Sequence, residues 1–300
     1  MQLFYHYTSL EAFKNIVESK TLWLTNSAFL NDSTEIINGK DFFNEITEIT
    51  LNELEIKRVK DFFRQFINDL TKPFDNYEMY IIPFCKEGDK KSQWVQYAPQ
   101  GIAIGFEKSV FPIDYNEIYQ LNDCLYTHES KRKAIIELLT DDIFMTKMVN
   151  IDNKSFDWKK EWGEEWGKIL DIVGQAVIHR FKKLKLSIDF DKELLYTKIL
   201  MYAQFKILAL LARFKDEGFE DEKEVRFVRI IGKDEVNKIS SRVCDNKFIP
   251  HTFLPIELSS IKQIIFGPSV NSKNADAIKQ FVAKNKIDCE FINSKIPLQL

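Results

Sequence analysis

The 300-residue sequence has few glycines and prolines and contains no long apolar run. Its 10 Gly and 8 Pro exclude collagen-like and low-complexity chains, in which these residues are abundant. The most apolar run, residues 207–212, is far shorter than the about 20 residues of a membrane-spanning helix. Because the first residues also lack the basic and apolar regions of a signal peptide, we expect a cytoplasmic protein that does not bind membranes.

Cysteine is also scarce, and its spacing excludes two kinds of site. Cys85, Cys124, Cys244 and Cys289 stand far apart, and no two of them form a C-x-x-C pair. This spacing argues against a zinc site and against a disulfide framework, so we predict reduced thiols and no bound metal. The signatures of P-loop, Rossmann, α/β-hydrolase and zincin enzymes are missing as well.

The chain lacks an excess of positive charge but is rich in aromatic residues. Its 42 Lys and Arg stand against 45 Asp and Glu, so the net charge is −3. A protein that binds duplex nucleic acid usually carries a basic surface, and the chain as a whole does not predict one. The 25 Phe, 10 Tyr and 5 Trp indicate a bulky interior.

Apolar periodicity predicts strands at both ends of the chain and helices between them. This order favours a mixed α+β fold in which residues 1–127 and 216–300 form the core. Residues 128–215 are then a helical insertion or cover. The expected strands lie at 3–7, 21–25, 80–84, 101–106, 222–231, 258–266 and 289–292, and the clearest expected helices at 10–19, 36–71 and 272–285.

A first candidate site lies where the first strand meets the first helix. His6, Tyr7 and Thr8 end the strand, and a helix N-terminus offers backbone N–H groups that favour anions. A histidine there can bind a ligand hydroxyl or act as an acid or base. The alternative is a core histidine that hydrogen-bonds the backbone.

A second candidate is the charged segment that opens a late strand. Glu222, Glu224 and Arg226 are two residues apart, so on a strand they share one face. Two carboxylates beside a guanidinium can raise the pKa of one acid or keep it ionised. The alternative is a half-exposed edge strand with a salt-bridged face, and the sequence leaves open which glutamate is the active one.

Two further pairs have both a functional and a structural interpretation. Trp94 and Tyr97 are three residues apart on an expected helical turn, where they can line a pocket or fill the core. Asn31 and Asp32 precede an expected helix, which they can cap, although they can also contact a polar ligand.

Seven motifs, taken together and in order, resemble a large bacterial family known as domain of unknown function 2971. The resemblance spans nearly the whole chain and is weakest at 128–215, and the family name implies no activity. The motifs lie at residues 4–13, 22–25, 29–35, 92–97, 101–106, 222–226 and 264–268.

A more remote similarity is to the ADP-ribosyltransferases, in particular DarT-type toxins and RNA 2′-phosphotransferases. It is carried by a first strand ending in His-x-Thr and a late strand with Glu-x-Glu. The resemblance implies that His6, with Tyr7 or Thr8 beside it, holds NAD as the substrate. It also implies that Glu224 supports the oxocarbenium-like transition state.

The remaining residues that we expect to contact the nucleotide fall in the same motifs. Trp94 or Tyr97 can stack on nicotinamide or adenine, and the other candidates are Arg226, Asn31 and Asp32. The middle Ser-Thr-Ser of arginine-modifying transferases is absent, and Arg226 has no set role in the general pattern.

These features lead to one main functional hypothesis and two alternatives. The main one is an NAD-dependent ADP-ribosyltransferase-like enzyme, such as a toxin or phage-defence effector, that cleaves the nicotinamide glycosidic bond and modifies a protein or nucleic-acid acceptor. It predicts that His6 and Glu224 face one cleft. The first alternative is a metal-dependent nuclease that uses Asp32, Glu35, and Glu222 with Lys223. The second is a non-catalytic nucleotide-sensing or interaction module, and its interface is a helical stripe formed by Trp158, Trp162 and Trp166.

Overall fold

The computed structural model describes residues 2–30, 34–52, 76–111, 119–139, 204–244 and 246–297, together with a few single residues between 64 and 74. The helices of the described residues include α1 (Leu10–Ser19), α2 (Thr34–Asn52), α4 (Lys91–Tyr97), α5 (His128–Glu137) and α9 (Ser272–Lys284), and residues 204–211 are helical as well. The strands are β1 (Leu3–Thr8), β2 (Thr21–Asn26), β3 (Tyr77–Cys85), β4 (Ile102–Glu107), β5 (Tyr119–Asp123), β6 (Glu224–Gly232), β7 (Ser240–Cys244), β8 (Lys247–Pro255), β9 (Ile261–Phe266) and β10 (Glu290–Asn293).

The chain divides into two compact units. The first contains residues 1–38, 76–127 and 212–300, and the second contains residues 39–75 and 128–211. This grouping joins residues 39–75 to the second unit, whereas the sequence-based division kept them with the core. Among the described helices, none is both long and apolar enough to cross a membrane.

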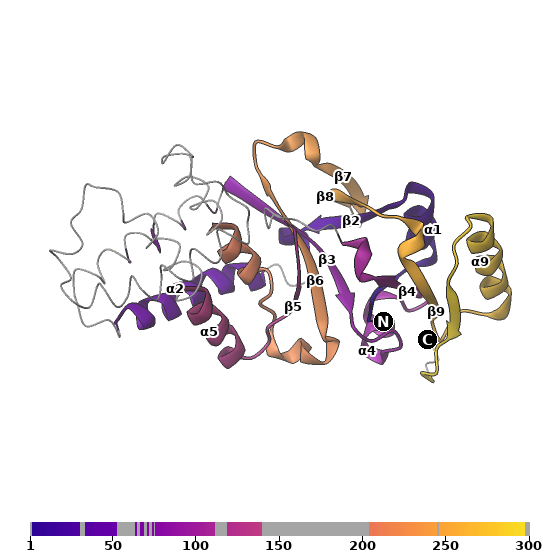
Figure 1. The fold of residues 1–300 in the computed structure, drawn as a ribbon, viewed down its shortest axis with the longest axis horizontal. Coiled ribbons are helices and arrows are strands. Elements are labelled where there is room, and N and C mark those ends of the chain that lie inside the picture. Colours follow the sequence, from indigo (N-terminus) through magenta and orange to yellow (C-terminus); the bar gives the residue numbers. More distant parts are fainter. Residues whose placement is uncertain are drawn as a thin grey trace, which may run out of the picture. The chain divides into compact units, whose positions relative to one another are not determined.

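All ten described strands belong to one sheet in the first unit. Their order is β10-β9-β4-β1-β3-β2-β8-β7, while β6 pairs with the other edge of β3 and carries β5 (Figure 1). Every pairing is antiparallel except that of β9 with β10, which α9 connects. The fold is therefore the expected mixed α+β class with a mostly antiparallel sheet.

Strand β3 is where the sheet forks. On one edge β6 accompanies β3 along its whole length. On the other edge the ladder passes from β2, where Thr25 lies opposite Ile81, to β1, where Tyr5 lies opposite Cys85. Pro83 stands between these two points, and its lack of an N–H suits a position where one strand gives way to another.

One face of the sheet is covered by α1 and α9. Helix α1 is capped by Ser9, whose hydroxyl accepts a hydrogen bond from the Ala12 N–H. Its residues Phe13 and Val17 are buried in the main core, and the Phe13 ring packs edge-on against Phe281 of α9 at 5.9 Å. The helical spacing of these apolar residues thus places a continuous stripe on the sheet.

The opposite face is covered near β1 and β4 by the short helix α4. Trp94 of α4 is fully buried and packs with Tyr7 and Ala103. Close approach depends on Gly101, because a Cβ there would lie 2.0 Å from the Thr8 carbonyl oxygen. The Gly101 carbonyl in turn accepts a 3.0 Å hydrogen bond from Gly267 N–H, so the motifs at 101–106 and 264–268 meet beside α4.

The structure corrects three sequence predictions of secondary structure. Strands β5, β7 and β8 were not predicted, the strand expected at 258–266 begins at Ile261, and the strand expected at 222–231 begins at Glu224. Strands β7 and β8 escaped prediction because β7 is short and polar and because Pro250 lies inside β8, where a proline argues against a strand. The three tryptophans at 158, 162 and 166 lie outside the described residues.

Candidate functional site

The segment with the paired glutamates lies in the interior of the sheet. Strand β6 is flanked by β3 on one side and β5 on the other, so the alternative of a half-exposed edge strand is wrong. Glu224 and Arg226 are 6% and 4% exposed. Charged groups this deeply buried require charged or hydrogen-bonding partners.

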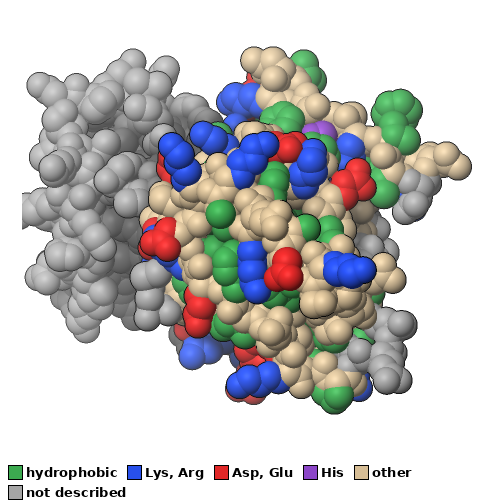
Figure 2. Space-filling view, turned by 90° about the vertical axis from the view of Figure 1, so that its right-hand side faces the viewer, with side chains coloured by type: hydrophobic (Ala, Val, Ile, Leu, Met, Phe, Trp, Pro, Cys, Tyr) green, Lys and Arg blue, Asp and Glu red, His purple; other side chains and the backbone are tan. Residues whose placement is uncertain are grey.

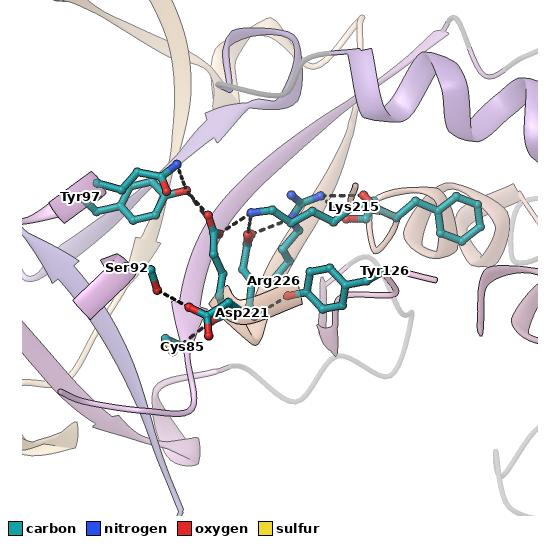
Figure 3. Close-up of polar contacts among 12 residues, drawn as sticks. Cys85, Ser92, Tyr97, Tyr126, Lys215, Asp221 and Arg226 are labelled. Atoms are coloured by element: carbon teal, nitrogen blue, oxygen red, sulfur yellow. Dashed lines mark hydrogen bonds and ion pairs between the residues drawn. The ribbon is translucent and has the colours of Figure 1, made fainter. Parts of the chain in front are cut away.

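Lys215 supplies the positive charge that joins the two glutamates. Its Nζ donates a 2.5 Å hydrogen bond to Glu222 Oε2 and a second hydrogen bond to Glu224 Oε2 (Figure 3). Arg226 Nε donates to the other oxygen of Glu224 at 2.7 Å. We call Lys215, Glu222, Glu224 and Arg226 the carboxylate cluster; all four are buried.

The backbone turns sharply between the two glutamates. Glu222 ends a 3-10 helix (Glu217–Glu222), and Lys223 follows in the left-handed region with φ 45°. The sequence placed Glu222 on the strand with Glu224, and this placement is wrong. The two carboxylates nevertheless lie less than ~5 Å apart, because each bonds the same nitrogen.

Arg226 also fixes the segment that carries Lys215. Its Nη1 donates hydrogen bonds to the carbonyl oxygens of Ala212 (3.0 Å) and Phe214 (3.2 Å). The Lys215 N–H donates to the Leu125 carbonyl at 3.0 Å, which joins this segment to the chain that follows β5. The lysine is therefore held by its backbone as well as by its charge.

Two tyrosines border the cluster from different elements. Tyr97 of α4 is half-buried, and its Oη lies 3.4 Å from both carboxylate oxygens of Glu222 (Figure 3). Tyr126 accepts a 2.7 Å hydrogen bond from the Glu224 N–H at the start of β6. On the far side of the turn, the Cys85 thiol donates to the Glu222 carbonyl at 3.2 Å.

The two glutamates differ in their electrostatic surroundings. Burial raises the pKa of Glu222, with a further contribution from the negative charge of Glu224, and both outweigh its bond to Lys215. Burial alone would also raise the pKa of Glu224, but Arg226 and Lys215 together lower it. The pKa of Lys215 is raised, since the two carboxylates outweigh the effect of burial. Such a pair suits chemistry that needs two carboxylates in different roles.

Polar contacts near the surface connect the start of α4 to the 3-10 helix that carries Glu222. Ser92 Oγ donates to Asp221 at 2.8 Å, and Lys90 Nζ lies 3.2 Å from the same carboxylate. Lys223 points away from the cluster and pairs with Glu87 at 2.9 Å. These contacts lower the pKa of Asp221 and of Glu87.

His6 lies on the opposite face of the sheet from the carboxylate cluster. Tyr5 is opposite Cys85, and Cys85 is opposite Glu224, so these three share one face. The next residue, His6, therefore points to the other face, where its ring centroid is 5.8 Å from that of Phe84. The sequence predicted that His6 and Glu224 face one cleft. The structure places them on opposite faces of the sheet, so this prediction is wrong.

The contacts of His6 are those of a histidine bonded to backbone. Its Nδ1 lies 3.1 Å from the carbonyl oxygen of Pro83, the residue at the fork of the sheet. Burial lowers its pKa, although the hydrogen bond to Pro83 opposes this shift. The ring is therefore neutral at pH 7, and its Nδ1–H satisfies a carbonyl where β2 gives way to β1.

Tyr7 and Trp94 are on the same face as the cluster, where they anchor a loop. Tyr7 Oη donates to the Glu87 carbonyl at 2.8 Å and accepts from the Lys90 N–H at 3.0 Å. Its ring meets Trp94 edge-on at 4.7 Å, and Trp94 Nε1 donates to Asp89 at 2.7 Å. Since Trp94 is fully buried, it presents no ring face to a ligand in this structure.

The other predicted contact residues are distributed differently. Thr8 is buried, with its carbonyl against Gly101. Asn31 and Asp32 lie outside the described residues, as does the side chain of Glu35. The structure therefore does not test the nuclease alternative, and among the described residues no His, Cys, Asp and Glu side chains form a group of three able to hold a metal.

Lys215 is the site residue that sequence reasoning missed. It lies directly after the apolar segment 204–212, at the boundary of the predicted helical insertion, and no motif spacing singles it out. The available signal was indirect: two acids and one guanidinium on a buried strand leave one negative charge without a partner. Only the fold brings this lysine to them.

Residues 93–227 match the sequence model of a family described as "Protein of unknown function (DUF2971)". The chain resembles that family over this stretch, which contains Tyr97 and all four residues of the carboxylate cluster. The comparison with curated proteins gives no match, and neither does the comparison with solved structures.

Proposed function

We propose that the carboxylate cluster is the catalytic centre of an ADP-ribosyltransferase-like enzyme that cleaves the nicotinamide–ribose bond of NAD. The observation that carries this proposal is the pair of buried glutamates that share Lys215 while their pKa values shift in opposite directions. Enzymes that cleave glycosidic bonds also use two neighbouring carboxylates in different roles, one of which can act directly on the sugar.

The contacts favour Glu222 as the acting residue. Both oxygens of Glu224 are taken by cations, Oε2 by Lys215 and Oε1 by Arg226. Glu222 is bonded to Lys215 through Oε2, whereas the described contact of its Oε1 is a long one, 3.4 Å, with Tyr97. Glu222 therefore retains acceptor capacity for a ligand, while Glu224 positions Lys215.

The proposed reaction places positive charge where Glu222 can stabilise it. The bond between ribose C1′ and the pyridinium nitrogen breaks, and its electron pair neutralises the departing nicotinamide. The ribose becomes an oxocarbenium-like cation, which a fixed carboxylate stabilises by several kcal/mol. Water or a nucleophilic group of a protein or nucleic-acid acceptor then bonds to C1′, and its proton passes to Glu222 or to solvent.

Among the residues considered for NAD, Tyr97 has the most suitable position. Its half-buried ring is directly beside Glu222, at the rim of the cluster (Figure 3). An aromatic ring there can stack on the nicotinamide or adenine ring. His6 takes no part in this proposal, because its face of the sheet is the opposite one.

The test is a mass-spectrometric assay of nicotinamide release and of ADP-ribose transfer, with purified protein, NAD, and added protein or nucleic acid. Glu222→Gln should lower the rate at least ~100-fold, since removing one preorganised electrostatic group has an effect of that order. Glu87→Gln is the matched control, because Glu87 is a neighbouring glutamate whose carboxylate pairs with exposed Lys223 instead.

Two outcomes would contradict the proposal. One is that the wild-type protein neither releases nicotinamide nor modifies any acceptor. The other is that Glu222→Gln retains the wild-type rate while its circular dichroism spectrum is unchanged. A slow Glu222→Gln variant and an unaffected Glu87→Gln variant would support it.

A further inference from the structure

An exposed aromatic group lies on the sheet at β2, β7 and β8, away from the carboxylate cluster. We call Trp23, Arg242, His251 and Phe253 the aromatic platform. Trp23 and Phe253 are each 40% exposed, although both are large apolar side chains. Trp23 stacks on His251 at 4.3 Å with 26° between the rings, and Phe253 meets both rings edge-on.

Strand register explains why these four side chains gather. Trp23 lies opposite Phe253, and Thr25 lies opposite His251, so the alternating residues of β2 and β8 share this face. Arg242 of the edge strand β7 lies opposite Ile249 and therefore faces the same way. Its guanidinium carbon is 5.6 Å from the Trp23 ring centroid, and its Nη2 donates to Thr25 Oγ1 at 2.9 Å.

The charges on this part of the sheet are of one sign. By strand alternation the face of β2, β7 and β8 that bears the platform carries Arg242 and Lys247 and has no Asp or Glu. Figure 2 shows Lys and Arg interspersed with Asp and Glu over the face that it presents. The platform thus combines exposed aromatic rings with cations. Such a surface is complementary to a ligand that carries both negative charge and flat apolar groups.

We propose that the aromatic platform binds single-stranded nucleic acid. Bases would stack on the exposed rings of Trp23 and Phe253, and Arg242 and Lys247 would lie against the phosphates. Aromatic rings interleaved with cations are the chemistry that holds single strands, because every base has a flat face and stacking tolerates any sequence. A duplex is a poor occupant, since its bases are already stacked and the chain has a net charge of −3.

The platform and the carboxylate cluster share one face of the sheet. Thr25 lies opposite Ile81, Ile81 lies opposite Val228, and Arg226 is two residues from Val228 on the same strand. A nucleic acid on the platform would therefore be on the catalytic face of the proposed enzyme. The binding proposal stands without that activity, because its test measures binding alone.

The experiment is fluorescence anisotropy with a labelled 15-nucleotide oligothymidylate at low ionic strength, using the full chain. We expect saturable binding that Trp23→Ala weakens about tenfold or more, which is the effect of losing one base-stacking contact. Arg242→Gln should weaken binding and also reduce its dependence on salt. Phe29→Ala, which removes an aromatic residue of similar exposure (43%) outside the platform, should leave the affinity unchanged.

Light scattering on the same samples tests the competing occupant, which is a second copy of the chain joined at the platform. The proposal is overturned if the wild-type protein binds no oligonucleotide, or if Trp23→Ala binds as tightly as the wild type. It is also overturned if the wild type dimerises, Trp23→Ala abolishes the dimer, and neither binds the oligonucleotide. Because Trp23 is exposed, we expect Trp23→Ala to keep the wild-type melting temperature within a few degrees.

Discussion

The two faces of the sheet at β1, β3 and β6 are built from alternating residues of the same short segments, yet one face is mainly apolar and the other is charged. On one face His6, Phe84 and Val225 form a neutral, mainly apolar packing. On the other, Glu224 and Arg226 belong to a buried group of charges. The comparison shows that one strand can stabilise the fold with one set of side chains and hold a buried group of charges with the other set.

The difference extends to how each face tolerates change. An apolar contact that is lost leaves a cavity, whereas a cation that is lost leaves buried negative charge with no compensation. The charged face should therefore be the more sensitive one to single substitutions and should recover when charges are removed together. Three sets of variants test this contrast.

The largest effect should follow removal of Lys215. Lys215→Met leaves Glu222 and Glu224 buried without their shared cation, and we expect a loss of about 3–5 kcal/mol in the free energy of unfolding. Urea denaturation followed by circular dichroism measures this loss. The double variant with Glu222→Gln in addition should regain part of the lost stability, because it leaves Glu224 paired with Arg226 and no unpaired charge in the cluster. A loss under about 1 kcal/mol in the single variant would show that Glu222 and Glu224 do not need Lys215 to compensate their charges.

The two glutamates should differ from each other by a smaller amount. Glu224→Gln weakens the bonds to both Lys215 and Arg226 and should cost about 3 kcal/mol, in line with charged hydrogen bonds. Glu222→Gln leaves Lys215 paired with Glu224 and removes a neighbouring like charge, so about 1 kcal/mol is expected. The same denaturation series gives both values, and the reverse order would reject the assignment of Glu224 as the positioning residue.

The smallest effect belongs to the neutral face. His6→Ala leaves the Pro83 carbonyl without its side-chain donor and should cost about 1–2 kcal/mol, while His6→Asn, which can still donate, should lose less. The pKa of His6 is lowered in the folded protein, so the unfolded chain takes up the proton first as the pH falls. The stability contributed by His6 is thus complete above about pH 6.5 and is lost as the pH falls towards the folded-state pKa.

The measurement for His6 is the free energy of unfolding between pH 7.5 and 5. In His6→Asn this part of the pH dependence should be flatter than in the wild type. Equal slopes in the two proteins would mean that the His6 proton does not distinguish the folded from the unfolded state. His6 could then no longer be described as a neutral residue that contributes to stability on the apolar face.

Much of the core could be predicted from local patterns. The helix expected at 10–19, the strand expected at 21–25 and the helix expected at 272–285 agree with the structure. These elements are specified by capping residues and by periodicities that repeat within the element. The convergence of Glu222, Glu224 and Arg226 was also predictable, because the three residues are close in sequence.

The rest depends on pairing between distant segments. Nothing near His6 in sequence shows that Cys85 sits opposite Tyr5, and this pairing decides that the histidine faces away from Glu224. The lysine of the cluster is likewise selected by the fold, since Arg226 and Leu125 hold its backbone from other elements. A one-residue change of register would reverse every such assignment of faces.

The strand order has a consequence for how the chain is made on the ribosome. The neighbours β4-β1-β3-β2 all come from residues 3–107. Three of the later strands add to an edge of this group, β6 to β3, β8 to β2 and β9 to β4. At roughly 5–20 residues per second, the edges of β2 and β4 remain open for about 10–30 s while the remaining chain is synthesised. We expect nascent chains that end before β8 to present these edges to chaperones and proteases, so synthesis order, as well as final stability, governs how much of the protein reaches its folded state.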